Sequence, residues 1–342
     1  MDYAHLGRSG LRVSRLCLGT MNFGPLTEPA DAHAIMDRAH ELGINFFDTA
    51  NRYGGAASPP GQVANNDQSH PGWTEEIIGD WFASGGGRRE RTVLATKLYG
   101  AMGDWPNEDR LSALNIRRAC DASLRRLQTD YVDLYQLHSD DADTPLDETL
   151  EALDAIVKSG KARYIGVSNF LAYRAARALG ISDVKGTARI VSLQPRYSLL
   201  FREIERELLP LALEEGLGVI PYNPLAGGLL TGKHKPGSAP TPGTRFTLGT
   251  TAQRYQERYW NERDFSTVQR LQGLAAEAGV SLTTLSVAWT LANPAITAPL
   301  LGASRPEQLD ETLAAATYRL DPALKQKLDE LTAEYRRGDA PR

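Results

Sequence analysis

Residues 131–169 read YVDLYQLHSDDADTPLDETLEALDAIVKSGKARYIGVSN, and this stretch decides the fold. It begins with a short run rich in Val, Leu and Tyr (131–138), which predicts a buried strand. Residues 145–158 follow with apolar side chains at helical spacing, and residues 164–169 form a second apolar run that ends in polar residues. A strand, a helix and a strand in this order predict a parallel pair joined by a right-handed crossover.

The same alternation of strands and helices extends along the chain in both directions. Eight strand–helix repeats are the number that closes a parallel barrel, so we predict an α/β fold, a (β/α)8 TIM barrel, as one domain over residues 1–342. The expected strands are 15–19, 45–49, 92–97, 131–138, 164–169, 190–194, 218–222 and 298–303. The expected helices include 32–42, 74–83, 112–127, 145–158, 201–214, 264–278 and 282–291.

A doubly wound open sheet is the structural alternative. Sheets of that kind which bind dinucleotides usually carry Gly-x-Gly-x-x-Gly after the first strand. Here the first strand runs into GTMNFG, residues 19–24, which does not fit that pattern. The barrel is therefore favoured.

Three segments interrupt the regular alternation. Residues 3–14 alternate polar and apolar side chains around glycines, which predicts an N-terminal β-hairpin that closes the bottom of the barrel. Residues 54–72 and 232–262 are long and rich in Gly, Pro and polar residues. Both follow the carboxyl ends of strands, where barrel enzymes place their active sites, so we expect long functional loops at this face.

Composition excludes several classes of function. A formal net charge of −4 offers no basic field for nucleic acid. The sequence contains no run of about 18 apolar residues, the length that a membrane-spanning helix requires, and no apolar segment of a signal peptide. Cys17, Cys120 and His70 lack metal-ligand spacing. We therefore expect a cytoplasmic protein that binds no metal, nucleic acid or membrane, and the oligomeric state stays open.

Four titratable residues stand at or just beyond consecutive strand ends: Asp48, Tyr53, Lys97 and His138. Each alone has a common structural explanation, such as a helix cap, a packing residue or a solvated charge. In a parallel barrel, however, these strand ends converge on one mouth. The combination predicts a catalytic site.

These residue types suit the reduction of a carbonyl group, which needs a hydride and a proton. A tyrosine donates the proton more readily if its pKa is brought below about 10, and the ammonium of Lys97 is placed to lower it. Asp48 supplies the counter-charge that keeps a buried lysine ionised. His138 is placed to hydrogen-bond the substrate oxygen.

Four phrases of the sequence form a recognisable set: GINFFDTA (43–50) followed by Tyr53 and Gly54, LATK (94–97), DLYQLH (133–138) and IGVSNF (165–170). Through them the sequence resembles the aldo-keto reductase family from about residue 6 to about residue 331. The resemblance implies Asp48, Tyr53, Lys97 and His138 as the catalytic tetrad and an NADPH site across the barrel mouth.

The resemblance also implies the cofactor contacts. Amide and hydroxyl groups after two strands would hold the nicotinamide carboxamide, Tyr222 would stack on its ring, and small residues would let the backbone approach the pyrophosphate. Ser304 and Arg305 suit a 2′-phosphate, which favours NADPH over NADH, and Arg245 is suited to close over the pyrophosphate. The set is Gly19, Thr20, Met21, Asp48, Ser168, Asn169, Gln194, Tyr222, Asn223, Pro224, Leu225, Gly227, Lys233, Arg245, Gly302, Ser304, Arg305, Gln308 and Glu311.

Three functions follow from this reading. The first is an NADPH-dependent oxidoreductase that reduces an aldehyde or ketone, a small-molecule carbonyl substrate, with Tyr53 as proton donor. The N-terminal phrase LGRSGLRVS (6–14) resembles the branch with potassium-channel β subunits and bacterial deoxysugar reductases. A reductase of a nucleotide-linked keto-deoxysugar and an NADPH-binding regulatory subunit with slow turnover are the alternatives. A diphosphate pocket needs extra cations at the mouth, where the loops offer Arg52, Lys233, Lys235 and Arg245, and Arg196 is interpreted as a surface or loop residue.

Overall fold

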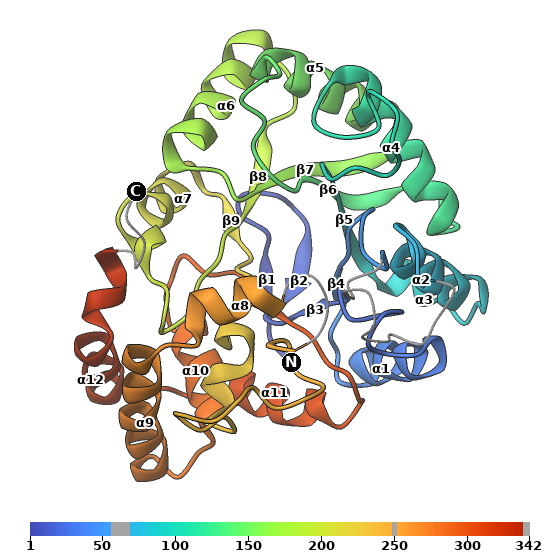
Figure 1. Cartoon of the computed structure of the whole chain (residues 1–342). Helices are drawn as coiled ribbons and strands as arrows, with labels where there is room; N and C mark the ends of the chain where they lie inside the picture. The colour runs from blue at the N-terminus through green and yellow to red at the C-terminus, as the bar shows by residue number, and fades with distance from the viewer. Residues whose placement is uncertain (56–68, 248–251, 338–342) are drawn as a thin grey trace.

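Eight parallel strands form the centre of the molecule in the computed structural model, which describes residues 1–55, 69–247 and 252–337. Their order in the sheet is β10-β3-β4-β5-β6-β7-β8-β9, so neighbours in the chain are neighbours in space. The two edges also meet, because Leu300 N donates to Pro221 O at 2.8 Å and Val219 pairs with Ile296. Figure 1 shows the helices following one another around these strands. The predicted (β/α)8 barrel is confirmed.

The observed strands lie within or beside the predicted ones. They are β3 Cys17–Gly19, β4 Phe46–Asp48, β5 Val93–Leu98, β6 Val132–Leu137, β7 Ala162–Ser168, β8 Ile190–Gln194, β9 Gly218–Val219 and β10 Leu300–Leu301. β5 is buried along its whole length, as expected for a strand covered on one side by helices and on the other by the barrel core.

The helices pack their apolar faces on the outside of the barrel. None of the described helices is by itself long and apolar enough to cross a membrane, and α9 and α10 meet those criteria only as a pair bent by 91°. The helices are α1 Pro29–Glu41, α2 Trp73–Ala83, α3 Arg88–Arg91, α4 Ala113–Arg126, α5 Leu146–Lys158, α6 Ala172–Lys185, α7 Leu208–Glu215, α8 Ala252–Tyr259, α9 Glu262–Glu277, α10 Leu282–Leu291, α11 Gln308–Thr317 and α12 Pro322–Leu331, with 3-10 turns η1 Glu203–Glu205, η2 Ala226–Thr231 and η3 Ala333–Arg337.

The N-terminal hairpin closes the bottom of the barrel as predicted. β1 (Tyr3–His5) pairs antiparallel with β2 (Arg12–Ser14). Leu6 and Val13 are fully buried against apolar residues from the barrel strands. Gly7 has a φ of 59°, and a Cβ there would lie 2.5 Å from Gly216 O, so the turn needs a glycine where it contacts the start of β9.

Two predictions about the second half of the chain were wrong. The single helix expected over 201–214 is a 3-10 turn, η1, followed by α7, because Pro210 has no backbone N–H and fits only the first turn of a helix. The segment 232–262, expected to be irregular, contains α8. Of the loop expected over 54–72, residues 56–68 lie outside the described part of the chain.

Candidate active site at the carboxyl ends of the strands

The four residues expected to be catalytic lie at one end of the barrel. Asp48 is the last residue of β4, Lys97 lies near the end of β5, and His138 follows β6. Tyr53 lies in the turn after β4, and its N–H donates to Ala50 O. Parallel pairing of β4, β5 and β6 brings their carboxyl ends to the same edge.

Lys97 and Asp48 form a buried ion pair. Lys97 Nζ lies 2.5 Å from Asp48 Oδ1 and donates to Thr49 O at 2.8 Å, and both charged side chains are almost completely buried. Burial acts to lower the pKa of Lys97, but the charge of Asp48 and the hydrogen bonds to Asp48 and Tyr53 outweigh it and the pKa is raised. The ammonium is therefore retained beneath the mouth.

The second carboxylate oxygen of Asp48 is held by two glutamine side chains. Gln136 Nε2 donates to Asp48 Oδ2 at 3.0 Å and Gln194 Nε2 donates to the same oxygen at 2.8 Å. Gln194 is thus engaged with Asp48 rather than directed only at a cofactor. Sequence reasoning missed Gln136, although its place two residues before His138 puts both on one face of the strand.

Tyr53 lies between His138 and Lys97. Its ring is 5.7 Å from the His138 ring in an edge-to-face arrangement, and Lys97 Nζ is 5.1 Å from its centroid. Burial raises the pKa of Tyr53, Lys97 opposes this, and the Asp48 charge adds to the rise. The expectation of a lowered pKa was wrong in sign, because loss of water around the phenol outweighs the ammonium. The phenol stays protonated at neutral pH.

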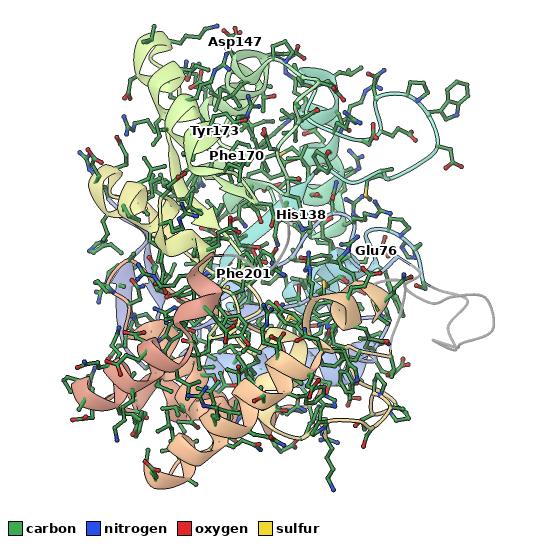
Figure 2. The ribbon with its side chains drawn as sticks, turned by 60° about the vertical axis from the view of Figure 1, so that its left-hand side comes forward. Glu76, His138, Asp147, Phe170, Tyr173 and Phe201 are labelled. Atoms are coloured by element: carbon green, nitrogen blue, oxygen red, sulfur yellow. The ribbon has the colours of Figure 1, made fainter. Side chains whose placement is uncertain are left out.

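His138 is neutral at this site. Burial first, and then the charges of Lys97 and Arg52, lower the pKa of His138 to about 3. Its backbone is fixed on both sides, because His138 N donates to Leu98 O and His138 O accepts from Asn169 Nδ2 at 2.9 Å. Figure 2 labels His138 near the middle of the molecule. A neutral imidazole can bind a carbonyl oxygen without adding charge.

The residues implied for the carboxamide form one hydrogen-bonded group. Ser168 Oγ donates to Gln194 O at 2.8 Å, and the Tyr222 hydroxyl donates to Asn169 Oδ1 at 2.8 Å. Asn169 adopts a left-handed backbone with φ 58°, which turns its amide between His138 and Tyr222. The ends of β6, β7, β8 and the segment after β9 are joined in this way.

The turn after β9 continues along the mouth. Asn223 Oδ1 accepts from Gly227 N at 2.7 Å, which shapes the turn, and Gly227 has a positive φ of 70°. Arg245 Nη2 reaches across to Asn22 Oδ1, 2.5 Å away, just beyond β3. Asn22 was not among the expected site residues. The other expected residues of this region are Gly19, Thr20 and Met21 at the end of β3, Pro224 and Leu225 in the turn, and the exposed Lys233 after η2.

The segment after β10 leads into α11. Gln308 Oε1 accepts from Ser304 N at 2.7 Å and so closes the loop onto the helix start. Glu311 Oε1 accepts from Ser281 Oγ at 2.7 Å, which ties this carboxylate to the first turn of α10. The residues expected here, all exposed, are Gly302, Ser304, Arg305, Gln308 and Glu311.

Arg196 is a loop residue whose side chain packs on an aromatic ring. Its guanidinium carbon lies 3.5 Å from the centroid of the Phe201 ring, and the side chain is partly buried. Arg196 follows the end of β8 and pairs with Tyr222. Arg196 lies in the loop between β8 and η1, in line with its interpretation as a surface or loop residue, and cation–π packing on Phe201 holds its side chain.

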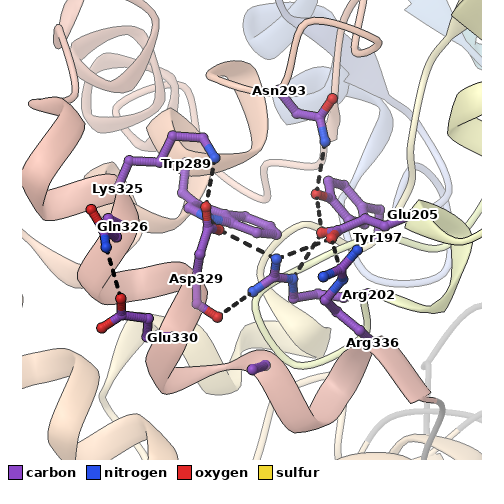
Figure 3. Close-up of a pocket in the computed structure, with 11 residues that line it drawn as sticks. Tyr197, Arg202, Glu205, Trp289, Asn293, Lys325, Gln326, Asp329, Glu330 and Arg336 are labelled. Atoms are coloured by element: carbon purple, nitrogen blue, oxygen red, sulfur yellow. Dashed lines mark hydrogen bonds and ion pairs between the residues drawn. The ribbon is translucent and has the colours of Figure 1, made fainter.

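A cavity of about 410 Å³ lies away from these residues, between η1, α10, α12 and η3 (Figure 3). Its charged groups bind one another: Arg202 pairs with Glu205 at 2.8 Å, and Asp329 accepts from Trp289 and Lys325. We interpret it as a structural ion-pair network. Within residues 1–55, 69–247 and 252–337, no group of three or more His, Cys, Asp or Glu side chains is arranged to hold a metal ion.

The fold and the acid–base groups at its mouth define a TIM-barrel oxidoreductase. The model of the Aldo/keto reductase family matches residues 15–333, and the chain belongs to this family.

Three relatives cover almost the whole chain. An uncharacterized oxidoreductase, YrpG, of Bacillus subtilis is 44% identical over 97% of this chain and 96% of its own. A probable voltage-gated potassium channel subunit beta of Arabidopsis thaliana is 34% identical, with 97% and 96% coverage. Versiconal hemiacetal acetate reductase of Aspergillus parasiticus is 31% identical, with 96% of each chain covered. One of these three relatives is thus named as a reductase.

Proposed function

We propose that the protein reduces an aldehyde or ketone to an alcohol with NADPH, and that Tyr53 donates the proton. The observation that carries the proposal is the Tyr53 ring 5.1 Å from Lys97 Nζ, beside the buried Lys97–Asp48 pair. This pairing places an acid next to a fixed positive charge at the carboxyl ends of the strands, where barrel enzymes bind their substrates.

The residues around the mouth fit NADPH. Lys233, Arg245 and Arg305 are cationic, and none forms an ion pair within the described part of the chain, which leaves their charges available to phosphate groups. Gly227 has a φ of 70°, and a Cβ there would lie 2.6 Å from the Tyr255 ring, so only glycine fits this turn beside the proposed cofactor path. When bound, NADPH would supply the hydride.

The acid–base groups then act on the carbonyl oxygen. Neutral His138 donates a hydrogen bond to this oxygen and holds it near Tyr53. As negative charge grows on the oxygen, the Tyr53 hydroxyl gives up its proton to it, forming the alcohol. The ammonium of Lys97 stabilises the phenolate that remains, and Asp48 keeps Lys97 charged and in place.

Turnover with a panel of carbonyl compounds tests this function. Purified protein is mixed with NADPH and aldehydes, ketones and keto-sugars, and the loss of nicotinamide absorbance is followed. We expect at least one substrate to be reduced, with NADPH preferred over NADH. Absence of turnover across the panel would reject the function.

The potassium-channel relative favours a second candidate, a regulatory subunit that binds NADPH and turns over slowly. An intact acid–base site is compatible with it, because product release can limit turnover. A single-turnover measurement separates the two: rapid oxidation of bound NADPH followed by a slow steady state supports the regulatory subunit, and equal rates support the reductase.

A further inference from the structure

Arg196 faces the candidate active site from the end of β8. Alternate residues of an extended strand point to the same side, so the side chain two residues beyond Gln194 follows the direction of the Gln194 amide, which reaches Asp48. The parallel bridge between Arg196 and Tyr222 continues the extended backbone through this point. Arg196 therefore lies above the catalytic residues, on the rim of the mouth.

The guanidinium of Arg196 is held in place but has no polar partner. It lies over the Phe201 ring at 3.5 Å and 5.9 Å from the Tyr259 ring, and Figure 2 labels Phe201 below His138. Its Nη1 is buried, and no hydrogen bond or ion pair to Arg196 is found within the described part of the chain. A buried donor without an acceptor is costly, so the arrangement suits a ligand that brings an acceptor.

Two further arginines reinforce this positive charge. Arg254 and Arg258 stand one turn apart on α8, and neither forms an ion pair with any described residue. Tyr259, the last residue of α8, brings this helix to Arg196, and while burial raises the pKa of Tyr222, Arg258, Arg196 and Arg254 all act to lower it. A group of unpaired cations raises the local concentration of anions.

We propose that Arg196, with Arg258 and Arg254 beside it, binds an anionic group of the carbonyl substrate, either a carboxylate or a phosphate. The inference rests on the proposed reductase function and narrows its substrate class to aldehydes and ketones that carry such a group. The planar guanidinium, already stacked on Phe201, can bind either oxyanion through two parallel hydrogen bonds.

The phosphate groups of NADPH are the alternative ligand for Arg196. The cations assigned to them, Lys233, Arg245 and Arg305, belong to the segments after η2 and β10. Arg196 instead follows β8, beside the Asn169 and Tyr222 side chains. We therefore assign Arg196 to the substrate, and the experiment below separates the two roles.

The test compares substrates that differ in charge and little in size. 4-Carboxybenzaldehyde is paired with its neutral methyl ester, and glyceraldehyde 3-phosphate with glyceraldehyde, so that carboxylate and phosphate are tested separately. For Arg196→Gln we expect the ratio of kcat/KM, anionic over neutral, to fall by about 10- to 100-fold in at least one pair, the range for a lost charge-assisted hydrogen bond. Arg117→Gln, an exposed arginine on α4, is the matched control and should leave the ratio unchanged.

Two further measurements make the outcome decisive. Arg196→Lys should recover part of the selectivity, since it keeps the charge and loses the paired hydrogen bonds. The Kd of NADPH, followed by fluorescence, should change by less than about threefold in Arg196→Gln, well below the loss expected for a residue that binds a phosphate.

A ratio that does not change, or a Kd for NADPH that rises in proportion to the loss of activity, would overturn the assignment. If no carbonyl is turned over, the proposed function fails instead. The anion site is then tested separately by binding of 4-(hydroxymethyl)benzoate to the protein with NADP⁺, which Arg196→Gln should weaken if Arg196 binds the carboxylate.

Discussion

The Tyr53 hydroxyl experiences opposing influences from its surroundings. Burial and the charge of Asp48 favour the protonated phenol, whereas Lys97 favours the phenolate. Both effects suit a general acid. Burial and Asp48 keep the hydroxyl protonated until negative charge develops on the substrate oxygen, and Lys97 then stabilises the phenolate that forms.

Removing the hydroxyl should therefore abolish proton donation and little else. We expect Tyr53→Phe to lower kcat by at least about 100-fold, the low end for general acid catalysis, while the Kd of NADPH stays within about twofold. Steady-state kinetics and fluorescence titration measure the two quantities. Near-wild-type kcat in this variant would assign the proton to another group.

His138 makes stability depend on pH. Its pKa is about 3 in the folded protein and 6.5 in the unfolded chain, so between these values the unfolded chain binds a proton that the folded protein does not. The free energy of unfolding therefore falls as the pH is lowered through this window. His40, with a pKa lowered to about 4 by burial, behaves in the same direction.

We expect the fall in unfolding free energy between pH 6.5 and pH 4 to be smaller in His138→Asn than in the wild type, because the variant lacks one of these protons. Urea denaturation across the pH range measures it, and His40 contributes equally to both proteins. Parallel stability curves for the two proteins would mean that His138 is protonated in the folded state.

At the scale of elements, the mouth is spanned by a contact between two loops. Arg245, after η2, reaches Asn22, after β3, and its guanidinium also lies 5.7 Å from the Tyr255 ring of α8. The segment that holds Arg245 thus connects the last strands of the barrel with the first one. A cofactor lying beneath this contact would have to break it to leave.

If this contact slows the release of NADPH, loss of either residue should speed that release. We expect Asn22→Ala and Arg245→Ala each to raise the dissociation rate of NADPH by about 10-fold, the effect of one charged hydrogen bond, and the double variant to add little to Arg245→Ala. Stopped-flow fluorescence measures the rates. Fully additive effects would show that the two residues act independently.

At the scale of the whole molecule, the C-terminal segment is attached to the barrel by a buried charge. Arg202, which directly precedes η1, is buried. It pairs with Glu205 and donates to Asp329 O and Thr332 Oγ1 at 2.8 Å (Figure 3). The network joins η1 to α12 and η3, which lie more than 100 residues later in the chain. It lies away from the four residues proposed to be catalytic.

We expect Arg202→Ala to destabilise the fold by about 3–5 kcal/mol, because Glu205 and Asp329 lose a buried partner. At a temperature where the variant is folded, kcat should stay within about threefold of the wild type. Urea denaturation and steady-state kinetics provide the two values. A large loss of kcat in folded protein would mean that this region communicates with the mouth.

The order of strands and helices and the four residues at the strand ends were predictable from the sequence. The local spacing of apolar residues predicts which strands and helix faces are buried, and polar residues at strand ends can be identified without knowing what they contact. The helix expected over 201–214 was wrong although the sequence carried a signal against it, because Pro210 has no backbone N–H and fits only the first turn of a helix.

The sequence by itself determined the barrel, its N-terminal hairpin, and Asp48, Tyr53, Lys97 and His138 as neighbours, since parallel topology alone brings their strand ends together. Only the tertiary structure decided the closure between β9 and β10, the two glutamines on Asp48, the raised pKa of Tyr53 and the place of Arg196. Each of these depends on distances between residues remote in sequence and on how much water the fold removes, and neither quantity is encoded in local pattern.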